Sequence, residues 1–281
     1  MPDPFEALRL PLTPAEPDPA FAQDLRARVE RALDLPEGTT VSNLGAHVAA
    51  LRHGGIGYAS LWVADADRAA AFFSQVLGWR AVPSGTGYQV EGRRIHHGIV
   101  PMPGRPTLFL AFAVRDIAEA TRNVREAGGE AGEVTAQPYG LASMCTDNQG
   151  ASFTVYQPSE GVGGSAATPA TGRPGDLSYV TMEVPGSERA RSFYGRVLGW
   201  RFSPGSVPGG WQVEDAEPMV GLSGGHSDCT NVPVYQTGDI AATLALVREA
   251  GGTSSGPEAR PYGLLADCTD DQGVRFGLWQ P

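Results

Sequence analysis

The sequence has no lysine: all 21 of its basic residues are arginine, against 31 acidic residues, which gives a formal net charge of −10. A surface that binds nucleic acid needs clustered positive charge to neutralise phosphates, and the arginines form no such cluster. Apolar runs are also short, and none approaches the roughly 20 residues that a membrane-spanning helix requires. We therefore expect neither a nucleic-acid partner nor a membrane partner.

Cysteine is scarce, with three residues and no pair at metal-binding or redox spacing: Cys145, Cys229 and Cys268. An odd number without such spacing argues against structural disulfides and against a cysteine zinc site. The start of the chain also lacks the basic and then apolar layout of a secretory signal. These absences predict a cytoplasmic protein.

The chain carries an internal duplication. Four blocks of sequence return at a nearly constant spacing of 121 to 123 residues (198 − 77 and 247 − 124). They are Leu-Gly-Trp-Arg (77–80 and 198–201), Val-Arg-Glu-Ala-Gly-Gly (124–129 and 247–252), Pro-Tyr-Gly-Leu (138–141 and 261–264) and Gln-Pro (157–158 and 280–281). A constant offset across four blocks indicates two copies of one unit.

The duplication divides the chain into an N-terminal extension, 1–53, a first copy, 54–158, a linker, 159–174, and a second copy, 175–281. The linker is rich in Gly, Ser, Ala, Thr and Pro, which is typical of a flexible segment. In the extension, apolar residues at every fourth position predict an amphipathic helix at about 18–35: Phe21, Leu25, Val29 and Leu33.

Within each copy, strand patterns alternate with helix patterns, which predicts an α+β fold. Residues 57–64 read as a strand, and Asp65 can cap a helix that Gly78 ends. A second strand over 107–114 leads to a helix capped by Asp116. The second copy repeats the scheme from Tyr179, with helices from Ser187 and Asp239.

These pieces resemble the vicinal-oxygen-chelate superfamily, which includes glyoxalases, bleomycin-resistance proteins and ring-cleaving dioxygenases. The resemblance rests on helix ends at 72–79 (Phe-Phe-x-x-Val-Leu-Gly-Trp) and 193–200 (Phe-Tyr-x-x-Val-Leu-Gly-Trp), and on turns at 147–150 (Asp-Asn-Gln-Gly) and 271–273 (Asp-Gln-Gly). It implies four βαβββ modules that form two tandem glyoxalase-like domains, each curled into an open cup, besides the N-terminal helix. The family spans several chemistries, so the fold alone does not name a reaction.

Metal-dependent members of the family hold a divalent cation in the cup with His, Gln or Glu at repeated positions. Here those positions fall on Tyr58, Phe109 and Thr154 in the first copy and on Tyr179, Val232 and Gly277 in the second. None of these is a good ligand for a divalent metal. We expect no cofactor, and a metal held through His96 or His97 is the least favoured alternative.

Side chains at every second strand position point the same way, which predicts what lines each cup. The predicted ligand-binding residues are Tyr58, Ser60, Trp62, His97, Phe109, Thr154 and Tyr156 in the first cup and Tyr179, Glu183, Gln236, Arg275 and Trp279 in the second. Aromatic walls with a few polar groups are typical of small-molecule pockets. We expect function mainly in the first cup.

Two of these residues are candidate acid–base groups. Alternation allows only one of His96 and His97 to face inward, and counting back along the strand favours His97. This histidine is either a hydrogen-bonded strand residue or a catalytic base. Glu183 is either solvated, paired with Arg275, or a general base with a raised pKa.

Three functions remain open. The first is a metal-free protein that binds a small aromatic or amphipathic ligand, for sequestration of or resistance to an antibiotic or metabolite. The second is a metal-independent lyase, isomerase or cyclase that uses His97 or Glu183. The third is a metal-dependent glyoxalase-like or dioxygenase-like enzyme. The expected partner is a small molecule, and the chain is expected to be a monomer with intramolecular pairing of its copies, or a homodimer.

Overall fold

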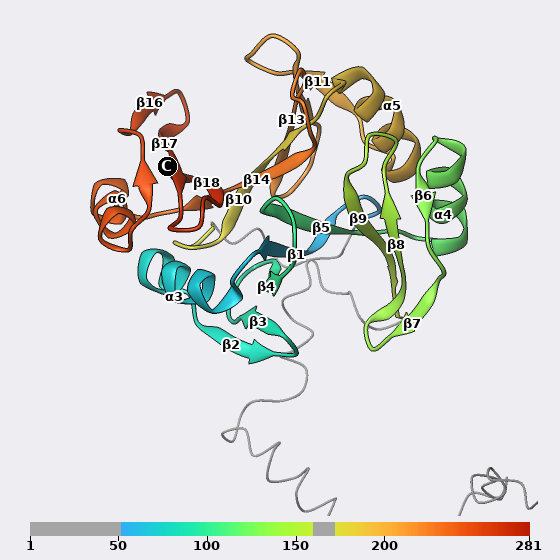
Figure 1. Ribbon diagram of the computed structural model, residues 1–281. Helices are drawn as coiled ribbons and strands as arrows, with labels where there is room; N and C mark the ends of the chain where they lie inside the picture. Colours follow the sequence, from blue (N-terminus) through green and yellow to red (C-terminus); the bar gives the residue numbers. More distant parts are fainter. Residues whose placement is uncertain (1–51, 160–171) are drawn as a thin grey trace, which may run out of the picture. The chain divides into compact units, whose positions relative to one another are not determined.

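The computed structural model of the protein describes residues 52–159 and 172–281, which belong to one compact unit, Gly45–Pro281. The N-terminal helix expected at about 18–35 lies outside the described residues, as do residues 160–171 of the expected linker. The first copy contains β1 (Ile56–Val63), α3 (Ala66–Leu77), β2 (Ala81–Ser84), β3 (Gly87–Val90), β4 (His96–Pro101), β5 (Thr107–Ala113), α4 (Ile117–Glu126), β6 (Glu130–Ala131), β7 (Thr135–Gln137), β8 (Gly140–Thr146) and β9 (Ser152–Pro158) (Figure 1).

The second copy repeats this order element by element. It contains β10 (Leu177–Glu183), α5 (Ser187–Leu198), β11 (Phe202–Pro204), β12 (Gly210–Val213), β13 (Met219–Ser223), β14 (Thr230–Gln236), α6 (Ile240–Glu249), β15 (Thr253–Ser254), β16 (Glu258–Arg260), β17 (Gly263–Thr269) and β18 (Arg275–Gln280). Among the described residues, no helix has the length and hydropathy needed to span a bilayer.

Each copy builds its own nine-stranded sheet. The first has the order β2-β3-β4-β1-β5-β9-β8-β6, and the second has the matching order β11-β12-β13-β10-β14-β18-β17-β15, with β7 and β16 paired to β8 and β17. In the first sheet, β1 runs parallel to β4 and antiparallel to β5, so two βαβββ modules join edge to edge along β1 and β5. The expected α+β fold with four such modules is confirmed.

Alternation along β1 sorts its side chains onto two faces. Ala59, Leu61 and Val63 are fully buried in the hydrophobic core with the helices, whereas Tyr58 and Trp62 lie on the other face, which forms the cup. The Asp65 carboxylate accepts a hydrogen bond from the Arg68 amide and so caps α3. Gly78, at φ 64°, ends this helix in the left-handed conformation, as the sequence predicts.

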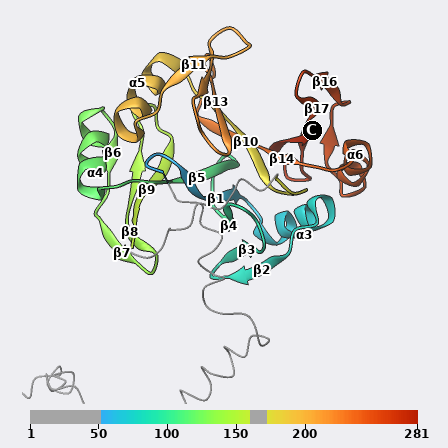
Figure 2. The same cartoon turned by 180° about the vertical axis from the view of Figure 1, so that it is seen from behind.

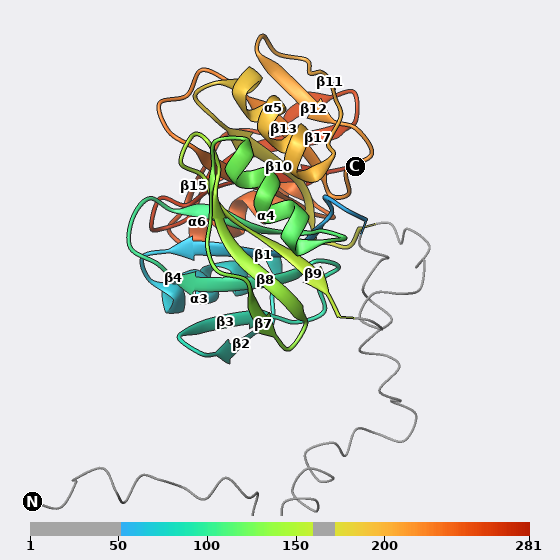
Figure 3. The ribbon, with the colours of Figure 1, turned by 90° about the vertical axis from the view of Figure 1, so that its right-hand side faces the viewer.

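The helices of one copy pack against the other copy. Helix α3 lies beside α6 and α4 lies beside α5 (Figures 1 and 2), and Figure 3 shows α4 over β8 and β9. The Trp79 ring packs edge-on against Tyr235 of β14 at 5.1 Å between centroids, and the Trp200 ring packs in the same way against Phe112 of β5 at 5.3 Å. The two copies therefore share one core with an approximate twofold arrangement.

The repeated sequence blocks make the same contacts twice across this interface. Trp79 Nε1 donates to Gly175 O and Trp200 Nε1 donates to Gly54 O, each at 2.9 Å. A Cβ at Gly129 would lie 2.8 Å from the ring of Phe193 in the other copy. The repeated tryptophans, Trp79 and Trp200, and the repeated Gly-Gly pairs thus have the same task in both copies, which is to pack one copy against the other.

Candidate functional site

The face of each sheet that points away from the helices forms a cup. In the first cup, Tyr58 on β1 lies beside Ala111 on β5, and Ala111 lies beside Thr154 on β9. In the neighbouring row of paired residues, Ser60 lies beside Phe109. A Cβ on Gly98 would collide with the hydroxyl of Tyr58, so this glycine lets the tyrosine lie flat against the sheet. Gly221 makes the same space for Tyr179 in the second cup.

Aromatic side chains in the first cup contact one another. Trp62 stacks on Phe109 with ring centroids 4.3 Å apart and an interplanar angle of 8°. Tyr156 is buried with Ala111 and Ala142 in a small cluster against which Tyr58 packs, and its burial raises its pKa above the usual value of a tyrosine. The predicted first-cup residues, except His97, lie on this one face: Tyr58, Ser60, Trp62, Phe109, Thr154 and Tyr156.

The expectation that His97 points into the cup is wrong. His97 is the register partner of Ala59, whose side chain faces the helices, while His96 is the partner of Tyr58 and takes the cup side. Strand β4 runs parallel to β1, so partners in this pair share a face. His97 is 2% exposed and lies in the core between the copies.

Both ring nitrogens of His97 are satisfied there. Nδ1 lies 3.0 Å from Gly98 O, an acceptor only, so Nδ1 carries the proton and donates it. Nε2 then accepts from the Tyr235 hydroxyl at 3.0 Å. Burial lowers the pKa of His97 to about 4, against the opposing effect of the Gly98 bond, and the charge of Arg93 lowers it further. The ring is neutral at ordinary pH.

The second cup contains a cavity of about 440 Å³. Its walls come from both modules: Thr181 and Glu183 on β10, Val232 on β14, and Arg275 on β18 line it together with residues of β15 and β17. Register places Tyr179, Gln236 and Trp279 on the same face as these residues. The indole of Trp279 donates to Tyr262 O at 2.9 Å.

Glu183 is held in an ion pair in this cavity. Its carboxylate accepts from both terminal nitrogens of Arg275, at 3.0 Å for the Nη1 bond, and lies 3.7 Å from Nδ1 of His226. Burial alone would raise the pKa of Glu183, but the bonds and charge of Arg275, with His226 and Arg105, hold it below the ordinary value. The hypothesis of a general base with a raised pKa is therefore wrong, and the pairing with Arg275 is correct.

Several cavity residues were not predicted from the sequence. Asp267 and Thr269 on β17 lie opposite Gly277 and Arg275, so alternation on that strand could have found them. Thr253 lies on the two-residue strand β15, which is too short to show any alternation. His226 lies in a loop, where strand alternation predicts no orientation for its side chain.

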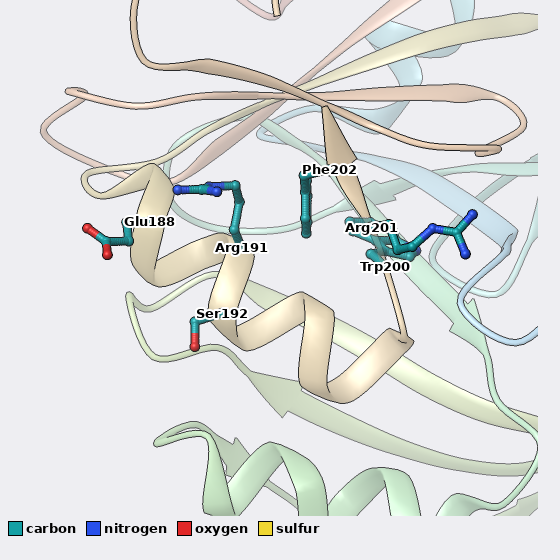
Figure 4. A pocket seen from close by; sticks show the side chains of 6 residues that line it. All are labelled: Glu188, Arg191, Ser192, Trp200, Arg201 and Phe202. Carbon is teal, nitrogen blue, oxygen red and sulfur yellow. The ribbon is translucent and has the colours of Figure 1, made fainter. Parts of the chain in front are cut away.

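A second hollow lies along α5 in the second copy. Figure 4 shows its lining on α5 and on the segment that follows this helix: Glu188, Arg191, Ser192, Trp200, Arg201 and Phe202. The guanidinium of Arg191 lies 3.6 Å from the centroid of the Trp211 ring, which is a cation–π contact. This hollow is open and polar, and none of the cup residues reaches it.

The cup residues do not fit a divalent cation. The predicted ligand positions are Tyr58, Phe109 and Thr154 in one sheet and Tyr179, Val232 and Gly277 in the other. The register rows through Tyr58 and Tyr179 instead contain Ala111 and Val234 in place of Phe109 and Val232. Each row contains one of the donors that such ions prefer, the imidazole of His96 beside Tyr58 and the carboxylate of Asp267 opposite Gly277, and a single donor is too few to hold the ion. Within 52–159 and 172–281, His, Cys, Asp and Glu form no group of three close enough to share an ion.

Known proteins share this architecture. Residues 59–156 match the family described as Glyoxalase-like domain. The chain is also similar to a Mn(II)-bound glyoxalase from Novosphingobium aromaticivorans, with 17% identity, a TM-score of 0.63 and coverage of 82% of each chain. Residues 59–156 therefore carry a glyoxalase-like domain, and the described residues have the vicinal-oxygen-chelate fold. The 2,3-dioxygenase LapB from Pseudomonas sp. KL28 has the same fold, with a TM-score of 0.62 at 13% identity over 83% of this chain and 94% of LapB.

Two further proteins are similar in sequence over most of the chain. The anthracycline biosynthesis protein DnrV from Streptomyces peucetius is 27% identical over 248 residues, which cover 76% of this chain and 88% of DnrV. DauV, an anthracycline biosynthesis protein from Streptomyces sp. (strain C5), is 26% identical with the same coverage.

Proposed function

We propose that this vicinal-oxygen-chelate protein binds a small, planar aromatic or amphipathic molecule in its second cup, without a metal ion. The cavity of about 440 Å³ carries this proposal. Pockets for drug-sized ligands are typically about 300–1,000 Å³ and combine apolar walls with a few fixed polar groups. Val232 supplies apolar surface here, and the Glu183–Arg275 pair supplies fixed charge.

The sequence relatives indicate the class of ligand. DnrV and DauV are named for anthracycline biosynthesis, and anthracyclines are polycyclic aromatic compounds with hydroxyl and carbonyl groups on the rings. Arg275 offers guanidinium donors and Glu183 offers carboxylate acceptors to such groups. The net charge of −10 favours a ligand that carries a positive charge. We place the protein in the cytoplasm because its three cysteines are free.

The alternative of a metal-independent lyase, isomerase or cyclase gains no support from the two residues first considered for it. His97 is enclosed in the core, and its two ring nitrogens are both hydrogen-bonded. Glu183 is an ionised partner of Arg275. Neither group is free to accept a proton from a substrate.

A titration with an anthracycline tests the proposal. Protein treated with a chelator is titrated with doxorubicin, and quenching of tryptophan fluorescence reports binding. We expect saturable one-site binding that is unchanged by chelator and at least about 10-fold weaker in Arg275→Ala, since a charge-assisted hydrogen bond contributes about 1.5–3 kcal/mol. Arg201→Ala is the matched control, because Arg201 also pairs with a glutamate, Glu214, but lies outside the cup.

Binding that requires added Mn(II) would contradict the metal-free proposal. Equal affinity for doxorubicin in the Arg275→Ala and Arg201→Ala variants would show that the ligand does not bind in the second cup.

A further inference from the structure

A serine, a histidine and a carboxylate form a chain at the edge of the second cup. Ser223 Oγ lies 2.9 Å from His226 Nε2, and His226 Nδ1 lies 3.7 Å from Glu183 Oε2. Ser223 ends β13 and is the register partner of Glu183 on the parallel strand β10, so both side chains are on the cup face. Glu183 lines the cavity.

The backbone fixes this arrangement. His226 N donates to Val184 O at 3.2 Å, and Gly225 N donates to Pro185 O at 3.1 Å, so the loop after β13 is anchored beside the end of β10. Arg275 holds the carboxylate of Glu183 in place with two hydrogen bonds. The ring of His226 therefore lies between the hydroxyl of Ser223, near Nε2, and the carboxylate of Glu183, near Nδ1.

The charge of Glu183 selects the tautomer of His226. A carboxylate near Nδ1 favours the proton on that nitrogen, which leaves Nε2 to accept the hydroxyl proton of Ser223. A serine bonded to a basic histidine nitrogen is the arrangement that activates a hydroxyl as a nucleophile. Arg275 donates one bond from each of Nη1 and Nη2 to Glu183 and has further N–H groups that could stabilise developing negative charge in the cavity.

The first copy has none of these groups. Its corresponding positions hold Trp62, Val100 and Pro103 in place of Glu183, Ser223 and His226. The three polar residues are therefore no requirement of the fold, since the same sheet forms without them.

We propose that Ser223 is a nucleophile and His226 its general base in an acyl-transfer site at the edge of the second cup, with Glu183 as the positioning residue and a small carboxylic ester as the substrate class. Ser223 Oγ bonds to the ester carbonyl carbon while its proton moves to His226 Nε2, and the carbonyl π electrons move to oxygen. The carbon–alkoxy bond then breaks, and the leaving oxygen takes the proton from His226. Water releases the acid by the same two steps with Ser223 Oγ as the leaving group, so ester and water become acid and alcohol.

A fluorophosphonate probe tests this site in the intact chain without any knowledge of the substrate. An activated serine forms an oxygen–phosphorus bond and releases fluoride, and peptide mass spectrometry locates the adduct. We expect one adduct per chain on Ser223 and none in Ser223→Ala. The labelling rate falls at least about 100-fold in His226→Ala, the scale of general-base catalysis. Thermal melting verifies that each variant is folded.

Ser227→Ala is the matched control, because Ser227 is an exposed neighbour whose hydroxyl bonds to Asp228 instead of His226. We expect this variant to be labelled at the wild-type rate. Glu183→Gln slows labelling and Glu183→Asp restores part of the rate, which a purely structural role of Glu183 does not predict. Release of p-nitrophenolate from p-nitrophenyl acetate follows the same order of variants.

The proposal is overturned if folded wild-type protein gains no adduct, if the adduct is on another residue, or if His226→Ala is labelled as fast as wild type. These outcomes are independent of doxorubicin binding. If the protein binds doxorubicin but is not labelled by the fluorophosphonate, the proposed binding function stands and the proposed acyl-transfer site is wrong.

Discussion

The Tyr235 hydroxyl donates a hydrogen bond to Nε2 of His97 across the interface between the two copies, at 3.0 Å. In the other half of the interface, the corresponding positions hold Phe112 and Val220. All four side chains are buried. Equivalent positions in the two halves of the interface are therefore filled by a hydrogen-bonded pair, His97 and Tyr235, and by an apolar pair, Val220 and Phe112.

This pair predicts strongly non-additive effects of mutation. His97→Val leaves the Tyr235 hydroxyl buried without a partner, and Tyr235→Phe leaves Nε2 of His97 without one, so each costs about 1–3 kcal/mol of unfolding free energy. The double variant reproduces the Val–Phe combination of the other half, and we expect it to recover at least about 1 kcal/mol relative to the sum. Denaturant unfolding of the four proteins measures this coupling. Additive losses would show that the hydrogen bond contributes nothing.

The same histidine predicts a loss of stability in acid. The folded pKa of about 4 lies below the ordinary value of 6.5, so between these values the unfolded chain binds the proton and the folded chain does not. Stability from this group is complete above pH 6.5 and falls as the pH drops towards 4, by about 3 kcal/mol. The measurement is unfolding free energy against pH, and the His97→Val/Tyr235→Phe variant should lack this part of the slope. Identical slopes in both proteins would contradict the assignment.

Trp62→Ala distinguishes the two cups. Because the cavity lies in the second cup, we expect doxorubicin affinity within about twofold of wild type and a loss of about 1 kcal/mol in stability from the Trp62–Phe109 stack. A loss of about 1–3 kcal/mol in binding would instead show a ligand stacked on Trp62, as the sequence suggested for the first cup. Fluorescence titration and thermal melting separate the two outcomes.

The fold was predictable because its signals are local and occur twice. The strand alternation of β1, the Asp65 cap and the Gly78 stop each follow from a few adjacent residues. The reason for the repeated motifs was not visible in sequence, because Trp79 and Gly129 contact residues of the other copy.

The site was less predictable than the fold. His97 was misplaced because a one-residue shift in β4 moves every side chain to the opposite face, and only its pairing with Ala59 fixes the register. Glu183 and its partner Arg275 follow from strand alternation on β10 and β18. The position of His226 beside Glu183 depends on a loop path that no sequence periodicity encodes.

Two glutamines link each copy to a helix start in the other. Gln272 accepts from Asp65 N and donates to Asp65 O, both at 3.0 Å, and Gln149 does the same at Gly186, at 2.7 and 3.1 Å. Helix α3 also has the Asp65 side-chain cap, whereas α5 begins at a glycine with no side-chain cap. The start of α5 therefore depends more on its glutamine.

We expect Gln149→Ala to destabilise the protein by about 1–3 kcal/mol, and by more than Gln272→Ala does, because unpaired backbone groups are left in a part-buried site. Gln89→Ala is the control, since Gln89 is exposed and makes only a 3.4 Å contact with Tyr58 in its own copy.

The shared core also predicts a monomer that unfolds in a single transition, which calorimetry and light scattering measure. Two resolved transitions, one per copy and unaffected by either glutamine, would show that the copies fold independently and that these links are not needed.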